Sequence, residues 1–107
     1  ITHGMGLSVV IPAWMRYVAE RHAARFASFA RRVFNVAIED DRAAAEAGIE
    51  ALVAFYKSLN MPVTMAELGA NDCPIESLAR HCCRRGPVGH LLALEAEDVE
   101  AILRRAL

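Results

Sequence analysis

Four histidines and three cysteines are the side chains of this 107-residue sequence that could bind a metal ion or act as nucleophiles. His3 stands in the opening stretch "THGMG", directly before an apolar run. A transition metal in a protein needs three or four ligands, and His22, His81 and His90 lack the paired spacings that place two ligands on one helix face. From the residues alone, a single histidine at a helix start is more often a capping or solvent-facing residue than a metal ligand.

The cysteines do not form a convincing metal or redox motif. Cys73, Cys82 and Cys83 are an odd set in which two are sequence neighbours, which favours reduced thiols over a disulfide framework. Adjacent helical residues point about 100° apart, so His81, Cys82 and Cys83 cannot converge on one ion. Cys82 shares the spacing of an apolar helix face, where we expect it to behave as a small hydrophobic residue.

The segment "TMAELGANDCPIESLARHCCRRG", residues 64–86, resembles a helix-turn-helix in outline. Its first helix would be barely one turn long. The second would begin with Cys73, Pro74 and Ile75, where a DNA-binding protein presents Arg, Asn or Gln to the bases. With a formal net charge of -1, attraction to phosphates is also weak, so the sequence does not favour nucleic acid as a partner.

The elements that must position these residues are helices. Apolar residues recur at spacings of three and four along most of the chain, and no segment alternates at period two, so we predict an all-α fold, a bundle of about five to six helices. Pro12 either starts the second part of the first helix or kinks it. Thr64 with Glu67 forms a capping box, Gly69 ends that turn, and Asp72 is expected to cap the next helix. The expected helices span about 7–18, 22–34, 39–60, 64–69, 72–85 and 95–105.

Each expected helix has a predicted inner face. Glu39 to Asp41 lie at the positive end of one helix dipole, and Arg104 and Arg105 at the negative end of the last. The residues expected to face inward are Phe26, Phe29, Ala30, Val33 and Phe34; Ile49, Leu52, Val53, Tyr56 and Leu59; Ile75, Leu78, Ala79 and Cys82; and Val99, Ile102 and Leu103.

The length fits one domain, residues 1–107, because it allows one hydrophobic core and not two. Apolar residues make up 55% of the chain, above the globular average, so we expect part of this surface to be buried in self-association or against another domain. The longest apolar run, 7–14, is too short to cross a bilayer and no signal peptide is evident, which predicts a cytoplasmic protein with no membrane partner. The first residue is not Met, which indicates a piece of something longer.

The opening segment, "THGMGLSVVIPAWMRYV", resembles the part of iron-containing (group III) alcohol dehydrogenases that carries their last metal-binding histidine. The segments "RFASFARRVFNV", "GIEALVAFYKSLNMP", "TMAELG" and "LEAEDVEAILRRAL" are similar, in order, to the C-terminal helical domain of the NAD(P)H-dependent butanol dehydrogenase branch. The resemblance covers essentially all 107 residues, and the order of segments is more specific than any one of them.

This resemblance implies a dehydroquinate synthase-like fold: an N-terminal α/β domain for the nicotinamide cofactor and a C-terminal all-α domain for a divalent metal, iron or zinc, held by one Asp and three His. His3 matches the last ligand. The other ligands and the cofactor domain would precede Ile1. Gly4 and Gly6 would let the backbone run close to the metal site. The fragment alone is expected to be inactive.

Two positions depart from the family pattern. Glu95 stands where the last helix usually has Thr, which predicts a weaker cap. His90 replaces what is often Asn, and nothing indicates that it binds metal. The alternative reading is a free-standing helical interaction or helix-turn-helix module, which a start codon just before Ile1 would favour. In the intact enzyme, the expected reaction moves hydride between the nicotinamide and a small alcohol or aldehyde, and the expected assembly is a homo-oligomer.

Overall fold

The structure, a computed structural model, describes residues 3–107, and this part of the chain contains six helices and no strand. One isolated antiparallel bridge joins Val88 to Leu94. The predicted all-α fold of five to six helices is therefore confirmed. The helices are α1 (His3–Ala19), α2 (Ala23–Phe34), α3 (Asp41–Ser58), α4 (Met65–Leu68), α5 (Ile75–Cys82) and α6 (Ala96–Arg105).

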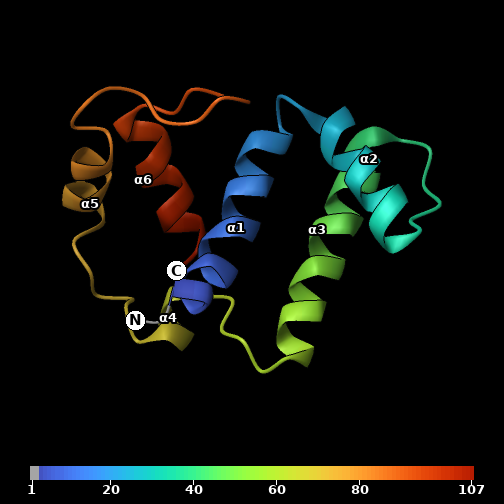
Figure 1. The fold of residues 1–107 in the computed structure, drawn as a ribbon, viewed down its shortest axis with the longest axis horizontal. Coiled ribbons are helices and arrows are strands. Elements are labelled where there is room, and N and C mark those ends of the chain that lie inside the picture. The colour runs from blue at the N-terminus through green and yellow to red at the C-terminus, as the bar shows by residue number, and fades with distance from the viewer. Residues whose placement is uncertain (1–2) are drawn as a thin grey trace.

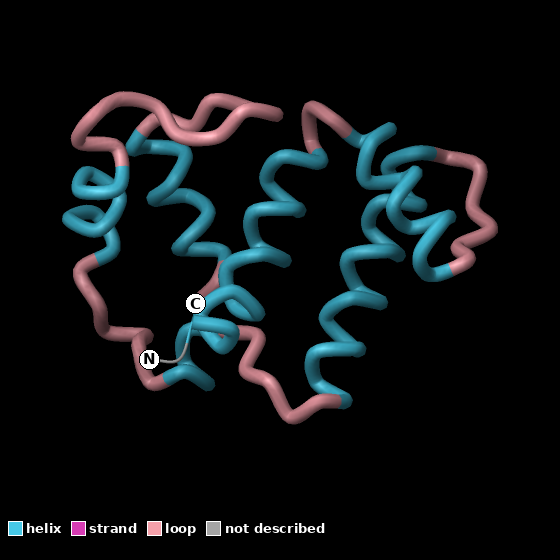
Figure 2. Tube along the Cα trace, in the orientation of Figure 1, coloured by secondary structure: helices cyan, strands magenta, loops and turns pink. Residues whose placement is uncertain are grey.

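The long helices lie side by side in a row (Figure 1). The order across the row is α5, α6, α1, α3 and α2, and each helix contacts its neighbours in that order. The tube in Figure 2 shows the loops running around the rim, with short α4 close to the start of α1. The described part measures 40 × 31 × 17 Å. Because a helix with its side chains is about 10–12 Å across, this depth lies between one and two helix diameters, and α2 also contacts α1 beside α3.

Helix α1 is the centre of the row because it is apolar on most of its circumference. Two groups of buried side chains flank it. Trp14 and Tyr17 pack against both groups and so connect them. The group on the α6 side consists of Val9, Ala13, Met65, Leu94, Ile102 and Ala106, and the group on the α3 side consists of Met15, Val18, Phe26, Ala45 and Ile49.

A buried hydroxyl fixes the connection between α3 and α4 against α1. Ser8 is only 2% exposed, and its Oγ lies 2.6 Å from the carbonyl oxygen of Pro62, to which it donates a hydrogen bond. Such a bond is needed because a buried polar group without a partner is costly. The helix itself runs unbroken through Pro12, and it begins at His3, so it includes the glycines that we expected to precede it.

Most helix ends follow the predicted signals. Asp40 caps α3 by accepting a hydrogen bond from the Ala43 N–H at 2.9 Å, and Thr64 accepts one from the Glu67 N–H at 3.1 Å. Asn60 and Gly69 follow α3 and α4 with positive φ angles of 60° and 79°, as their left-handed tolerance predicts. The Asp98 carboxylate caps α6 by accepting the Glu95 N–H at 2.9 Å, so this end is held although Thr is absent.

The predicted cap at Asp72 is wrong. Helix α5 begins only at Ile75, with Pro74 in the capping position, and Asp72 lies in the preceding turn. The reason is local, since a proline disfavours helical backbone in the residue before it and therefore delays the helix until Pro74 has passed.

The outer ends of the predicted inner faces are also wrong. Val33 is 58% exposed, Leu59 56% and Leu78 44%, and Cys82 is exposed rather than part of an apolar face. In so shallow a row of helices, side chains away from the seams between neighbouring helices stay exposed unless a loop covers them. Helical spacing identifies an apolar side but not how far along the helix a neighbour extends.

The segment with the helix-turn-helix outline does not form two packed helices. Helix α4 is a single turn of four residues, and its Met65 N–H bonds to the carbonyl oxygen of Ala106 at 2.7 Å. It packs on α1, whereas α5 packs on α6. Among the described residues, no helix is long and apolar enough to cross a membrane.

The closest approach of two helices occurs between α2 and α3, at Gly48. A Cβ atom built on Gly48 would lie 2.4 Å from the Cβ of Ala30 and 2.9 Å from its Cα, so only glycine fits there. In contrast, a Cβ built on Gly6 in α1 would have no neighbour within 4 Å in the described part of the chain. These two helical glycines therefore differ in their surroundings.

We expect Gly48→Ala to lower the free energy of unfolding by about 1–3 kcal/mol, because the methyl group forces α2 and α3 apart. Gly6→Ala is the matched control, and it should raise stability by up to about 1 kcal/mol through helix propensity alone. Urea unfolding followed by circular dichroism measures both. A stable Gly48→Ala variant would contradict the close packing of α2 on α3.

Candidate metal centre

His3, the predicted metal ligand, is the first residue of α1 as the structure describes it, and its side chain is exposed. Leu7, Val10 and Trp14 follow at four, seven and eleven residues, which places them on the same side of the helix as His3. The histidine therefore stands at the end of an apolar strip rather than in a polar pocket.

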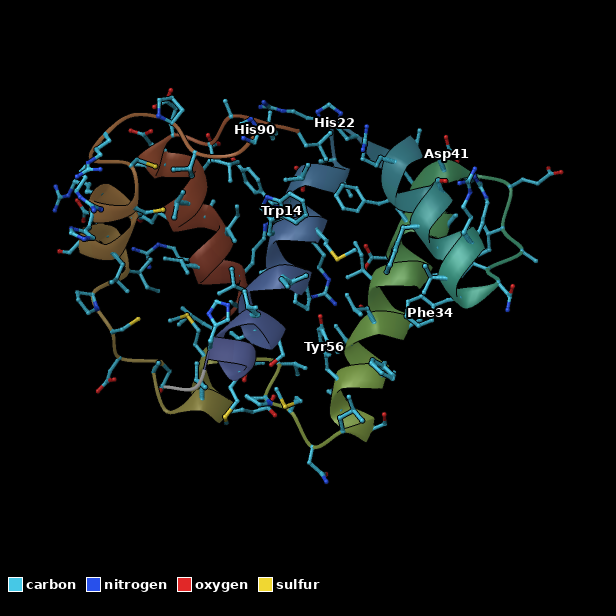
Figure 3. All side chains as sticks on the ribbon, in the orientation of Figure 1. Trp14, His22, Phe34, Asp41, Tyr56 and His90 are labelled. Carbon is cyan, nitrogen blue, oxygen red and sulfur yellow. The ribbon has the colours of Figure 1, made fainter. Side chains whose placement is uncertain are left out.

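The fold does not place the other three histidines close to His3. His22 and His90 lie near the far end of α1, as Figure 3 shows. A helix of 17 residues is about 25 Å long, so this end is far from His3. His81 lies on α5, beyond α6 in the row. Within residues 3–107, no group of three or more His, Cys, Asp or Glu side chains could hold a metal ion.

The donor set of the described chain therefore does not fit a complete metal site. One imidazole leaves most of the coordination shell to other groups. Cβ atoms built on Gly4 and Gly6 would have no neighbour within 4 Å in residues 3–107. The close backbone approach expected at these glycines is therefore not made by the described part of this chain.

A polar cluster that the sequence did not predict joins α1 to α6. The hydroxyl of Tyr17 donates a hydrogen bond to the Asp98 carboxylate. This bond raises the pKa of Tyr17 above its usual value and lowers the pKa of Asp98 below its own. Arg105 lies over the Tyr17 ring, 5.4 Å from its centre, and pairs with Glu20 at 2.8 Å. Since 81 residues separate Tyr17 from Asp98, no local pattern could predict their contact.

A surface hollow of about 430 Å³ lies beside this cluster. Two of its arginines are already paired, Arg16 with Glu50 at 2.8 Å and Arg105 with Glu20. Arg16 stands 13 residues after His3, which corresponds to about 20 Å along α1, so the hollow is not part of a site at His3. Its lining residues are Arg16, Ala19, Glu20, Arg42, Ala45, Glu46 and Arg105.

The three cysteines are free, as predicted. The Cys83 Sγ lies 3.5 Å from the carbonyl oxygen of Leu94, and burial raises the pKa of its thiol, which keeps it protonated and weakly nucleophilic. This contact connects the residue that follows α5 to the loop before α6. Nothing in these contacts points to redox chemistry.

Comparison with known proteins decides the family. All of residues 1–107 match the model of the Fe-containing alcohol dehydrogenase family, C-terminal. The chain belongs to the iron-containing alcohol dehydrogenase family. This confirms the resemblance seen in the sequence.

Relatives in the iron-containing alcohol dehydrogenase family match along the whole chain. The probable NADH-dependent butanol dehydrogenase 1 of Bacillus subtilis (strain 168) is 36% identical over 109 residues, which cover 100% of this chain and 28% of that protein. NADH-dependent butanol dehydrogenase A of Clostridium acetobutylicum is 29% identical over 110 residues, covering 99% of this chain and 28% of that protein.

A solved structure shares the arrangement of helices. The crystal structure of NADH-dependent butanol dehydrogenase A from Thermotoga maritima matches with a TM-score of 0.87 and 31% identity, over 99% of this chain and 29% of that one. The chain thus spans under a third of the length of these members of the iron-containing alcohol dehydrogenase family.

We expect Tyr17→Phe to reduce stability by about 1 kcal/mol near neutral pH, because the Asp98 carboxylate loses a hydrogen-bond donor. Asp98 has a lowered pKa in the folded state, so its contribution is present above the usual carboxyl pKa and is lost as the pH falls through the lowered value. Tyr17 has a raised pKa, so its contribution is present below about pH 10 and is lost as the pH rises through the raised value.

The measurement is urea unfolding of the original protein and of Tyr17→Phe, from acid pH below the usual carboxyl pKa to alkaline pH above about 10. The difference should be largest from about pH 5 to 9 and should shrink on either side. Tyr56→Phe on α3 is the matched control. A difference between Tyr17→Phe and the original protein that does not change with pH would show that the Tyr17–Asp98 bond contributes nothing.

Proposed function

We propose that residues 1–107 form the C-terminal domain of a metal-dependent alcohol dehydrogenase or aldehyde reductase of the butanol dehydrogenase type. In the whole protein, hydride would pass between NAD(P)(H) and a small alcohol or aldehyde. The observation that carries this proposal is the match of the entire chain to the family model, together with the shared fold. A free-standing helical module is less well supported, because the relatives are more than three times as long.

The proposed metal ligand of this chain is His3, which offers one imidazole nitrogen at the start of α1. The family resemblance implies that one Asp and two His from the part preceding residue 1 complete a site for iron or zinc. A metal ion held there supplies Lewis-acid polarisation of the substrate oxygen. The exposure of His3 supports this arrangement, since the side chain is free to meet groups from outside the described chain.

The cofactor would be bound by an N-terminal dinucleotide-binding domain. The butanol dehydrogenases of Bacillus subtilis and Clostridium acetobutylicum are named NADH-dependent, which favours NADH as the reductant here. The whole protein is proposed to be a homo-oligomer, because Phe55 and Leu59 leave apolar surface exposed at the end of α3. Sedimentation of the whole protein measures its assembly.

We expect residues 1–107, prepared alone, to be inactive and to hold no metal tightly, because a single imidazole leaves most ligand positions to water. Elemental analysis after dialysis against buffer is the measurement. Stoichiometric iron or zinc retained by this chain alone would contradict the proposed division of ligands.

In the whole protein, His3→Ala should remove most of the bound metal and most of the alcohol-dependent reduction of the nicotinamide, because a four-ligand site loses one donor. Nicotinamide binding should stay nearly unchanged, since the other domain would supply it. Metal content, turnover and cofactor titration are measured side by side.

The controls are His22→Ala, His81→Ala and His90→Ala, which change histidines that the structure keeps away from His3. All three should keep their metal and their activity. Full metal content and a near-normal rate in His3→Ala, or loss of metal in a control, would refute the assignment of His3.

A further inference from the structure

Helix α1 exposes an apolar strip beside the candidate ligand. We use this name for Leu7, Val10 and Trp14, which lie on one side of α1 in line with His3. Leu7 is 41% exposed and Val10 36%, whereas Trp14 is half-buried and packs edge-on against Phe26 with ring centres 5.7 Å apart. The exposed part of the strip is therefore its first half, next to His3.

Beyond its first turn, most of the rest of α1 is covered. Its two flanks pack against α6 and α3, and the side opposite the strip carries Ser8 and Pro12, which are both buried, with Ser8 bonded to Pro62 of the 59–64 connection. Domains usually bury their helices between at least two packed layers. A row of helices 17 Å deep is thinner than two full layers, and α2 covers only the Trp14 end of the strip, so no second layer of residues 3–107 covers Leu7 and Val10.

We infer that the apolar strip is the docking surface for the part of the same protein that precedes residue 1. This inference rests on the proposed function, in which the missing metal ligands lie in that part. The matched family model is the C-terminal one and the chain covers only 28–29% of its relatives, so most of such a protein precedes this domain. A segment that crosses Leu7 and Val10 would also reach His3, because the three residues lie on one side of α1 within about two helical turns.

The glycines support a close approach at this end of α1. Gly4 and Gly6 lie within three residues of His3, and glycine weakens a helix relative to alanine. Nothing in residues 3–107 lies within 4 Å of a Cβ built on either, so no contact inside the described chain requires them. A second copy of this domain is the less suitable occupant, because it offers only the same residues and no described cluster of metal ligands.

The test is site-specific photo-crosslinking in the whole protein. The photoreactive residue p-benzoylphenylalanine replaces Leu7 in one variant and Val10 in a second, and Val33 on α2, which is more exposed than either, in a control. After irradiation, peptide mass spectrometry identifies the partner of each link, and gel mobility separates links within one chain from links between two.

We expect positions 7 and 10 to give links within one chain to peptides from before residue 1, and position 33 to give none to those peptides. Links to residues 1–107 of a second copy would overturn the inference and identify a subunit interface. Links only to residues 1–107 of the same chain, or none at all, would overturn it too.

A stability measurement adds a second readout. Leu7→Glu should lower the unfolding midpoint of the whole protein by roughly 5 °C or more, because a charge enters a covered apolar contact, whereas Val33→Glu should change it by less than about 1 °C. An unchanged midpoint in Leu7→Glu would argue that the strip stays in solvent. Neither measurement uses turnover, so failure of the proposed enzymatic function would be seen separately, as an absence of alcohol-dependent nicotinamide reduction.

Discussion

The arrangement of the helices depends on one constraint. Helix α1 is apolar on most of its circumference, so other parts of the protein must cover it. Its flanks are filled by side chains from α6 and α3, and Trp14 and Tyr17 contact both groups, so the two halves of the row share a single helix. Burying a Val or Ile side chain is worth roughly 1.5–3 kcal/mol, so covering the buried Val9 and Val18 of α1 contributes substantially to the stability of this domain. The position of His3 follows from it, because the candidate ligand begins the helix that α2, α3, α4 and α6 all contact.

Directional contacts then fix the positions of the helices around α1. Gly48 lets α3 approach Ala30 of α2 without a side chain between them, and this contact fixes the spacing of α2 and α3. On the other side, the Tyr17–Asp98 bond ties α1 to the first turn of α6, where Asp98 also accepts the Glu95 N–H. Apolar packing has little directional preference. Such polar and steric contacts therefore select one alignment of the helices among several that would bury a similar apolar area.

The sequence predicts the helices and most of their ends, because caps and left-handed residues such as Asp40, Thr64 and Asn60 act within a few positions. It fails where the outcome depends on neighbours distant in the chain. Val33, Leu59 and Leu78 have the spacing of buried residues yet are exposed, since no other element within residues 3–107 covers them. The Tyr17–Asp98 contact joins residues 81 apart and leaves no local trace. His3 could be named only through the family motif, because its spacing to the other histidines carries no signal.

A ligand at the edge of a domain has a physical consequence for metal binding. When the donors come from separate parts of a chain, the ion binds tightly only after those parts are packed together, so its binding energy also stabilises their contact. An exposed imidazole at the end of an apolar strip fits this arrangement, because packing across the strip and filling of the coordination shell would occur in the same step. Two helical glycines beside His3 leave that edge bare and allow another backbone to come close. On this proposal, the start of α1 would gain its contacts from the part of the protein that precedes residue 1.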